Sequence, residues 1–140
     1  MADNNKKLVF HVSAQRMDEN ASIARCKDAE LLLDTRLAGR SDALNPAELL
    51  LTAIAACIIK GIERVTPILQ FEFSELEVSI SGMRQDAPPK MESIQYCIKI
   101  RSPESDARLA LLHDNVKKFG TVYNTVAPGT ELSGELIRMT

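Results

Sequence analysis

The thiol and imidazole groups are the side chains of this 140-residue chain best suited to nucleophilic or metal chemistry. There are three cysteines, Cys26, Cys57 and Cys97, and two histidines, His11 and His113. The cysteines are widely spaced and form no CxxC pair, so the sequence offers no zinc-ligand set and we expect neither a metal nor a cofactor. An odd number of cysteines also argues against a disulfide framework. We therefore expect reduced thiols and a cytoplasmic protein.

Charge and length exclude several classes of protein. Seventeen basic and 19 acidic side chains leave a net charge of −2, which provides no basic surface for nucleic acid or an anionic membrane. The polar residues 1–7 do not have the pattern of a signal peptide or membrane anchor. The longest apolar run, residues 49–59, is shorter than the roughly 20 residues of a membrane-spanning helix. We expect one globular domain over residues 1–140.

A long helix is predicted around the second cysteine. Residues 45–48 read Asn-Pro-Ala-Glu, with asparagine as the N-cap, proline at the first helical position and glutamate closing a capping box. The helix is expected to reach about Thr66 and to end at Pro67. It is apolar nearly all round over residues 49–59, which predicts burial on every side. A chain of this size would struggle to surround about 30 Å of helix, so we predict a homodimer packed around it.

Short strands are predicted on both sides of this helix. Residues 8–15 alternate between apolar and polar, as in a half-buried strand. A turn is expected at residues 17–20. Two strands at 21–27 and 30–35, separated by Lys27-Asp28, and a loop at 36–44 complete an antiparallel meander. After the helix we expect a strand at 75–81, a connection at 82–90 and a strand at 93–100. A second helix should be opened by Ser102-Pro103-Glu104 and closed by Gly120 as its C′ residue. A short irregular or helical piece at 121–126 and a strand at 131–139 should complete the chain. This β-β-β-α-β-β-α-β order is an α+β fold.

The segment from Asn45 to Cys57, NPAELLLTAIAAC, resembles the signature of the OsmC/Ohr family, the osmotically inducible and organic hydroperoxide resistance proteins. Similar segments follow in the same order at residues 74–78, 84–89 and 121–126. The resemblance implies an OsmC-like α+β fold with a long buried central helix. It also implies an intertwined homodimer with two active sites at its interface.

The same resemblance implies a thiol reaction with small hydroperoxides. Cys57 corresponds to the cysteine whose thiolate attacks the O–O bond and becomes a sulfenic acid. A second cysteine of the family then forms a disulfide with it, which an external dithiol reduces. In this chain the position of that second cysteine falls on Gly120. An external thiol is therefore expected to complete the cycle.

The family's other catalytic groups map less directly. The hydroperoxide-resistance branch has a glutamate directly after Asn-Pro, where this chain has Ala47. Glu48 lies roughly 180° around the helix from Cys57, so it does not replace that group. The family arginine, which stabilises the thiolate or the peroxide, maps onto Arg16. Three other arginines remain open for this role: Arg25, Arg36 and Arg40.

Each candidate also has a purely structural interpretation. A cysteine in an apolar helix is most often an inert core residue, because burial keeps the thiol protonated. Lys60 and Arg64 follow Cys57 at i+3 and i+7, where they could lean toward the sulfur or simply form the solvated end of the helix. Cys26 and Cys97 are incidental thiols or substitutes for the missing second cysteine. The remaining candidates are expected to be surface or packing residues: His11, His113, Tyr96 and Tyr123.

Three functions follow from these alternatives. The first is thiol-dependent reduction of organic or inorganic hydroperoxides by Cys57, with Arg16 in support. The second is a non-catalytic dimer that binds a small hydrophobic ligand in its interface cleft, because Ala47 and Gly120 remove two functional groups of the family. The third is a structural dimer in which Cys57 fills space.

Overall fold

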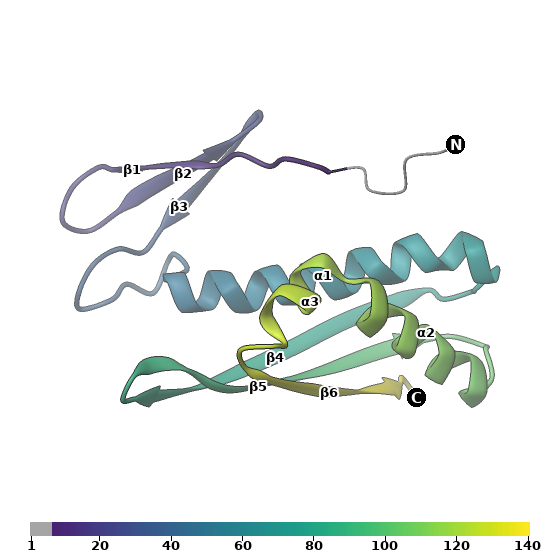
Figure 1. The fold of residues 1–140 in the computed structure, drawn as a ribbon. Helices are drawn as coiled ribbons and strands as arrows, with labels where there is room; N and C mark the ends of the chain where they lie inside the picture. The colour runs from purple at the N-terminus through teal and green to yellow at the C-terminus, as the bar shows by residue number, and fades with distance from the viewer. Residues whose placement is uncertain (1–6) are drawn as a thin grey trace. The chain divides into compact units, whose positions relative to one another are not determined.

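A computed structural model describes residues 7–140, which form two compact units, one ending at Leu49 and the other running from Leu50 to Thr140. Residues 1–6, on which the prediction about a signal peptide largely rests, lie outside the described part. Each unit contains a three-stranded sheet (Figure 1). The elements are β1 Ser13–Arg16, β2 Ser22–Cys26, β3 Ala29–Leu33, α1 Pro46–Leu69, β4 Glu75–Asp86, β5 Pro89–Arg101, α2 Asp106–Phe119, α3 Thr121–Val126 and β6 Glu131–Arg138.

The first unit is the predicted antiparallel meander, with strand order β1-β2-β3. Lys27, at φ 55°, forms the tight turn between β2 and β3 together with Asp28. The turn before β2 is closed by Asp18, whose Oδ1 accepts the N–H of Asn20 at 2.7 Å and of Ala21 at 3.1 Å. Local turn chemistry therefore accounts for the positions of both turns.

The first strand is shorter than predicted and is shifted toward the C-terminus. The alternating pattern predicted a strand over residues 8–15, whereas β1 covers only Ser13–Arg16. Its four residues pair with residues 25 to 22 of β2, which ends one residue later at Cys26. In this unit residues 8–12 consequently have no strand to pair with, and the side chains of Leu8, Phe10 and Val12 are exposed.

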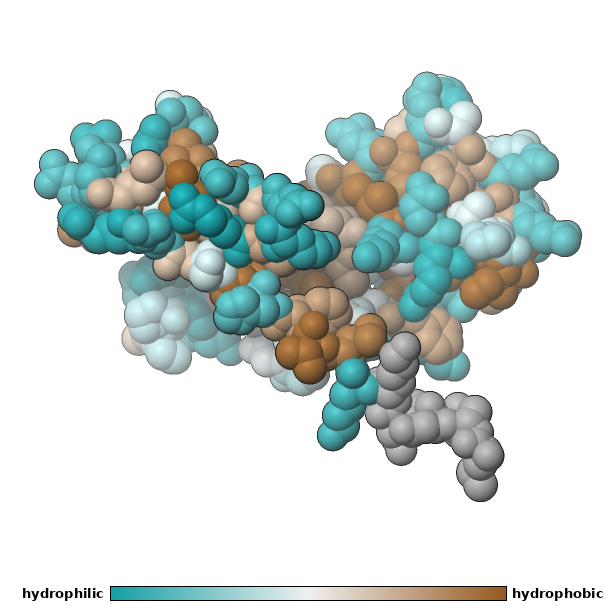
Figure 2. Space-filling view, turned by 90° about the horizontal axis from the view of Figure 1, so that it is seen from above, coloured by the Kyte–Doolittle hydropathy of each residue, from teal (hydrophilic) through white to brown (hydrophobic). Residues whose placement is uncertain are grey.

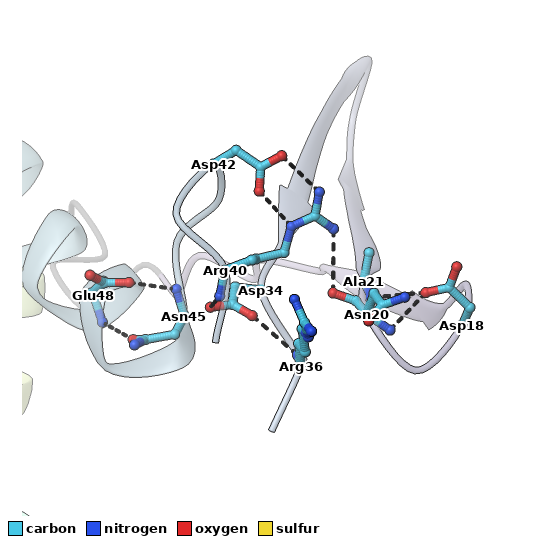
Figure 3. A network of polar contacts seen from close by, with 9 residues as sticks. All are labelled: Asp18, Asn20, Ala21, Asp34, Arg36, Arg40, Asp42, Asn45 and Glu48. Atoms are coloured by element: carbon cyan, nitrogen blue, oxygen red, sulfur yellow. Dashed lines mark hydrogen bonds and ion pairs between the residues drawn. The ribbon is translucent and has the colours of Figure 1, made fainter. Parts of the chain in front are cut away.

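A buried carboxylate organises the predicted loop after β3. Asp34 is only 4% exposed, and its Oδ1 and Oδ2 accept the backbone N–H groups of Arg36 and Arg40 at 3.1 and 3.0 Å (Figure 3). Its own N–H donates to the carbonyl of Leu44 at 2.9 Å. The carboxylate therefore fixes the backbone of the loop between residues 34 and 40.

Helix α1 begins as predicted and ends later. The Asn45 N–H donates to Glu48 Oε1 at 2.9 Å, and the Glu48 N–H donates to Asn45 Oδ1 at 2.8 Å, which is a capping box (Figure 3). The predicted end at Pro67 is wrong, because the helix continues through this proline to Leu69. Pro67 has no N–H, so only one helical hydrogen bond is lost, the one to the carbonyl of Glu63. Glu63 is exposed, so water can satisfy that carbonyl. The left-handed residue Gln70, at φ 50°, ends the helix.

The second unit is built on a mixed sheet of order β4-β5-β6. β4 and β5 form a long antiparallel hairpin, so most of the connection predicted at residues 82–90 is strand. The hairpin continues past a register shift between Met83 and Arg84. β6 pairs parallel to β5, and α2 and α3 make the crossover that a parallel pair requires.

The helix predicted from residue 102 begins later, because the N-cap is Ser105 and not Ser102. Ser105 Oγ accepts the N–H of Arg108 at 3.2 Å, whereas Ser102 Oγ accepts the N–H of Glu104 in the turn before the helix. Gly120 directly follows α2, as predicted, but its φ of −76° is an ordinary extended conformation. The glycine is therefore not required by a left-handed helix end.

The core of the second unit lies between the sheet and its helices (Figure 1). Helix α1 contributes one buried face, Ile54, Ile58, Gly61, Ile62 and Val65. The predicted burial of α1 on every side is wrong for the single chain, because Leu50, Ile59 and Ile68 are 39%, 38% and 73% exposed. Apolar side chains thus reach the surface (Figure 2). Over the described residues, no helix is long and apolar enough to cross a membrane.

Candidate functional site around Cys57

Cys57 lies at the boundary between the buried and exposed faces of α1. At 100° per residue it is roughly 80° from the middle of the buried face, which explains its intermediate exposure. Its side chain packs against the apolar core of the second unit. The sulfur is therefore neither sealed in the core nor fully in water.

The backbone of Gly120 lies directly beside the Cys57 sulfur. A Cβ built on Gly120 would be 3.1 Å from Cys57 Sγ, and equally close to Tyr123 Cβ and the Val116 carbonyl oxygen. Glycine is favoured here by this close approach, since a Cβ would require its neighbours to shift by a few tenths of an ångström, and not by its backbone angles. In a disulfide, the Cβ of one cysteine lies about 3 Å from the sulfur of the other. Position 120 therefore has the geometry of a disulfide partner for Cys57 but carries no sulfur.

The cations near Cys57 differ in what they contact. Arg64 Nη1 donates to the Phe119 carbonyl at 3.2 Å, and its guanidinium lies 5.3 Å from the centre of the Phe119 ring. Arg64 thus stabilises the C-terminal end of α2. It therefore does more than form the solvated end of its helix, which was one of the roles predicted for it. Lys60, one turn after Cys57, is exposed.

The two other cysteines are not equivalent as partners. Along β5 the side chains of Tyr96 and Ile98 are buried against the helices, so Cys97 between them points to the opposite face of the sheet. There it lies between Ser79 of β4 and Glu135 of β6. Cys97 therefore cannot act as the missing second cysteine for Cys57 of the same chain. Cys26, at the end of β2, belongs to the first unit.

The arginines of the first unit separate into engaged and free groups. Arg25 interacts with Glu30 and Gln15, and Arg40 pairs through two nitrogens with Asp42 (Figure 3). Among the described residues, the guanidinium groups of Arg16 and Arg36 make no hydrogen bond or ion pair. These two are therefore the arginines of this unit whose charge is available to a ligand.

A partly buried cluster that the sequence did not predict lies near Gly120. The Tyr96 hydroxyl and His113 Nε2 are 2.7 Å apart, and the rings of Tyr96 and Tyr123 meet edge to face at 6.2 Å. Burial, and secondarily the interaction with Tyr123, raises the pKa of Tyr96. Burial, reinforced by the charge of Lys117, lowers the pKa of His113. At neutral pH both groups are therefore uncharged, and the tautomer of the imidazole decides which of them donates.

The positions of Tyr96 and His113 in the sequence contained one usable signal for this pair. Tyr96 occupies the apolar face of an alternating strand, where a hydroxyl needs a buried partner. His113 follows Leu109 by four residues and Leu112 by one, so it flanks the apolar stripe of its helix. The pairing itself joins β5 to α2 and could not be derived from either pattern.

The comparisons with known proteins agree with this fold. The family profile described as OsmC-like protein matches residues 39–134. An OsmC-like protein from Mycoplasma pneumoniae has a similar structure, with a TM-score of 0.87 and 20% identity over 97% of this chain and 99% of the other. No curated protein sequence gives a match.

Structures named as hydroperoxide resistance proteins are also similar. The organic hydroperoxide resistance protein OsmC from Legionella pneumophila has a TM-score of 0.70 and 15% identity, over 94% of this chain and 99% of the other. The organic hydroperoxide resistance protein OhrB of Bacillus subtilis has a TM-score of 0.68 and 18% identity, over 92% of this chain and 98% of the other. At these identities the structures establish the shared fold, and the profile match establishes the family. The chain belongs to the OsmC-like protein family.

Proposed function

We propose that this protein reduces organic or inorganic hydroperoxides with Cys57 as the nucleophile. The Cys57 thiolate attacks one peroxide oxygen, so that an S–O bond forms, the O–O bond breaks and the leaving oxygen takes up a proton to become an alcohol or water. Cys57 is then a sulfenic acid. The observation that carries this proposal is the partly buried position of Cys57 on the family's helix motif, with the backbone of Gly120 beside its sulfur.

An external thiol is proposed to complete the cycle. A first thiol condenses with the sulfenic acid, releasing water and leaving a mixed disulfide, and a second thiol reduces that disulfide and restores the Cys57 thiol. Gly120 supplies no sulfur at the adjacent position, and Cys97 lies on the far face of the sheet. Such a cycle suits a reducing compartment such as the cytoplasm.

Arg16 is the proposed stabiliser of the thiolate or peroxide, and Arg36 is its competitor. Both guanidinium groups are free of partners within the described residues, whereas Arg25 is engaged by Glu30. Loss of one charged donor at a reacting centre typically lowers the rate by about 100-fold or more. We expect Arg16→Gln to lower kcat/KM for a hydroperoxide to this extent, with Arg36→Gln and Arg25→Gln as matched controls. A large loss only in Arg36→Gln would assign the role to Arg36.

The functional molecule is proposed to be a homodimer. Leu50 and Ile68 lie within roughly 20° of Cys57 around α1, and both are exposed in the single chain. Leu8, Phe10 and Val12 add a second set of exposed apolar side chains in the first unit. Exposed apolar surface of this kind marks an interaction site. Light scattering at micromolar concentration should give twice the chain mass of 15.5 kDa.

The decisive experiment is mass spectrometry after mild hydroperoxide treatment in the presence of a sulfenic-acid trap. We expect the trap adduct on Cys57, loss of peroxide turnover in Cys57→Ser, and unchanged turnover in Cys97→Ser. A trap adduct absent from Cys57 would refute the enzyme. It would leave the two other hypotheses, a dimer that binds a small hydrophobic ligand and a structural dimer, which differ in whether an apolar probe binds to the protein.

A further inference from the structure

Positive charge gathers beside Cys57 at the surface of the second unit. Lys60 lies about 60° from Cys57 around α1, and Arg64 lies about 20° from it. Helical side chains lean toward the N-terminus of their helix, so both cations lean toward the sulfur. Lys118, near the end of α2, has its Nζ 5.3 Å from the centre of the exposed Phe119 ring. We call these three exposed cations, Lys60, Arg64 and Lys118, the cationic rim.

The contact of Arg64 with α2 limits its distance from the Cys57 sulfur. Arg64 Nη1 donates to the Phe119 carbonyl at 3.2 Å, and a Cβ on the next residue, Gly120, would lie 3.1 Å from Cys57 Sγ. Across one peptide of standard dimensions, the guanidinium nitrogen is therefore no more than about 11 Å from the sulfur. A guanidinium has five N–H donors, and this hydrogen bond uses one of them. The others can bind a carboxylate while the contact with Phe119 is kept.

The charge of the cationic rim is not compensated by carboxylates of the chain. Among the described residues, none of its three side chains forms an ion pair, whereas the neighbouring Lys117 pairs with Asp114 at 3.6 Å. The acidic residues of α1 point away from Cys57, since Glu48 lies roughly 180° and Glu63 roughly 120° around the helix from it. The whole chain has a net charge of −2, so this positive surface is a local feature. It can attract an anion that approaches Cys57.

The reducing thiol has to reach the Cys57 sulfur itself. Position 120 has no sulfur, and Cys97, the other cysteine of the second unit, lies on the far face of the sheet. A thiol attacks as its thiolate, so negative charge arrives at Cys57 in the reducing step. A hydroperoxide, in contrast, reacts as an uncharged group. The positive charge beside Cys57 therefore favours the approach of the reductant.

We propose that the cationic rim binds the carboxylate of the small thiol that reduces oxidised Cys57. The thiolate attacks the sulfenic sulfur, so that an S–S bond forms, the S–O bond breaks and the hydroxyl leaves with a proton as water. A second thiolate attacks the sulfur of the bound thiol and releases Cys57, so two thiols are oxidised to one disulfide. A carboxylate a few bonds from the thiol can meet Arg64 while the two sulfurs react. The inference rests on the proposed function in taking the sulfenic acid of Cys57 as the group that is reduced.

Thiol–disulfide exchange at Cys57 tests the rim without any peroxide. In a Cys26→Ser/Cys97→Ser background, Cys57 is converted to its mixed disulfide with thiopyridone, and an added thiol that attacks the Cys57 sulfur releases the absorbing thiopyridone. The rate constant for mercaptosuccinate, a dicarboxylate, is divided by the rate constant for uncharged β-mercaptoethanol. This preference ratio is compared between variants, so the intrinsic reactivities of the two thiols cancel.

The two lysines of the rim provide the test variants because they hold no backbone contact. We expect Lys60→Gln and Lys118→Gln each to lower the preference ratio about two- to fivefold, the range that one exposed charge pair supplies. Added salt should lower the ratio of the parent toward that of the variants. Lys99→Gln is the matched control, because it removes an exposed lysine from the far face of the sheet, and it should keep the parent ratio.

Three results would overturn the inference. The first is an unchanged preference ratio in both rim variants, and the second is an equal fall in Lys99→Gln, which would mean that only the net charge of the protein matters. The third is an unchanged ratio combined with slower turnover of a carboxylate-bearing hydroperoxide in the rim variants, which would assign the rim to the peroxide. Exchange at Cys57 needs no sulfenic acid, whereas the proposed function fails when the sulfenic-acid trap leaves Cys57 unmodified. The two proposals therefore fail separately.

Discussion

Gly120→Cys is expected to create a disulfide with Cys57. The Cβ position at residue 120 is 3.1 Å from Cys57 Sγ, which matches the separation of about 3 Å between these atoms across a disulfide. The backbone of Gly120, at φ −76° and ψ 120°, accommodates any L-residue. The substitution therefore places a Cβ at the distance from Cys57 Sγ that an S–S bond would require.

The effect on stability depends on the redox state. Closing the loop from residue 57 to residue 120 removes unfolded-state entropy worth about 4 kcal/mol. Against this, the new Cβ lies 3.1 Å from Tyr123 Cβ and the Val116 carbonyl, and such overpacking costs about 1–3 kcal/mol in either redox state. We expect the oxidised variant to be about 1–3 kcal/mol more stable than the parent, and the reduced variant to be less stable by about 1–3 kcal/mol.

Urea unfolding with and without dithiothreitol measures both states. Gly120→Ala carries the same Cβ without sulfur and isolates the overpacking cost. Peptide mapping of the oxidised variant under non-reducing conditions should give a cross-linked pair that contains residues 57 and 120. Treatment with one equivalent of hydroperoxide should form the same cross-link, and it should be lost when Cys57→Ser is added.

The reasoning is refuted if residues 57 and 120 do not cross-link on oxidation while Cys57 remains open to alkylation. That result would mean that the contact between Gly120 and the sulfur is not maintained in solution. A cross-link to Cys97 instead would contradict the assignment of that thiol to the opposite face of the sheet.

Three other outcomes follow from single contacts. Asn45→Ala removes one side of the capping box and should lower the free energy of unfolding by about 1 kcal/mol, measured by chemical denaturation against the exposed control Ser41→Ala. Gly134→Ala places a methyl group against the Tyr96 ring and carbonyl and should cost about 1–3 kcal/mol or more, whereas Gly129→Ala meets no atom within 4 Å and should cost much less. Because the pKa of His113 is lowered in the folded state, the unfolded chain binds its proton more readily, so stability should fall as pH drops from 6.5 toward the folded-state pKa. His113→Gln should flatten that part of the pH profile, while His11→Gln should not.

Much of the fold follows from patterns that span only a few residues. The capping box of Asn45 and Glu48, the turn at Lys27 and the alternation in β5 each depend on neighbours in the chain, and each was predicted. The errors occurred where a local pattern competed with its surroundings. The apolar alternation of residues 8–12 is real, but β2 is too short to pair with it. Pro67 was predicted to end α1, but near the helix end it removes only one hydrogen bond.

The sequence by itself determined the helix that carries Cys57, the family motif around it and the absence of a second cysteine at position 120. Only the tertiary structure decided that Gly120 touches the Cys57 sulfur, that Arg64 binds the end of α2, and that Tyr96 meets His113. The physical reason is the range of the interactions. Caps and strand alternation depend on residues a few positions apart, whereas these contacts join residues far apart in sequence and exist only after the helices have packed on the sheet.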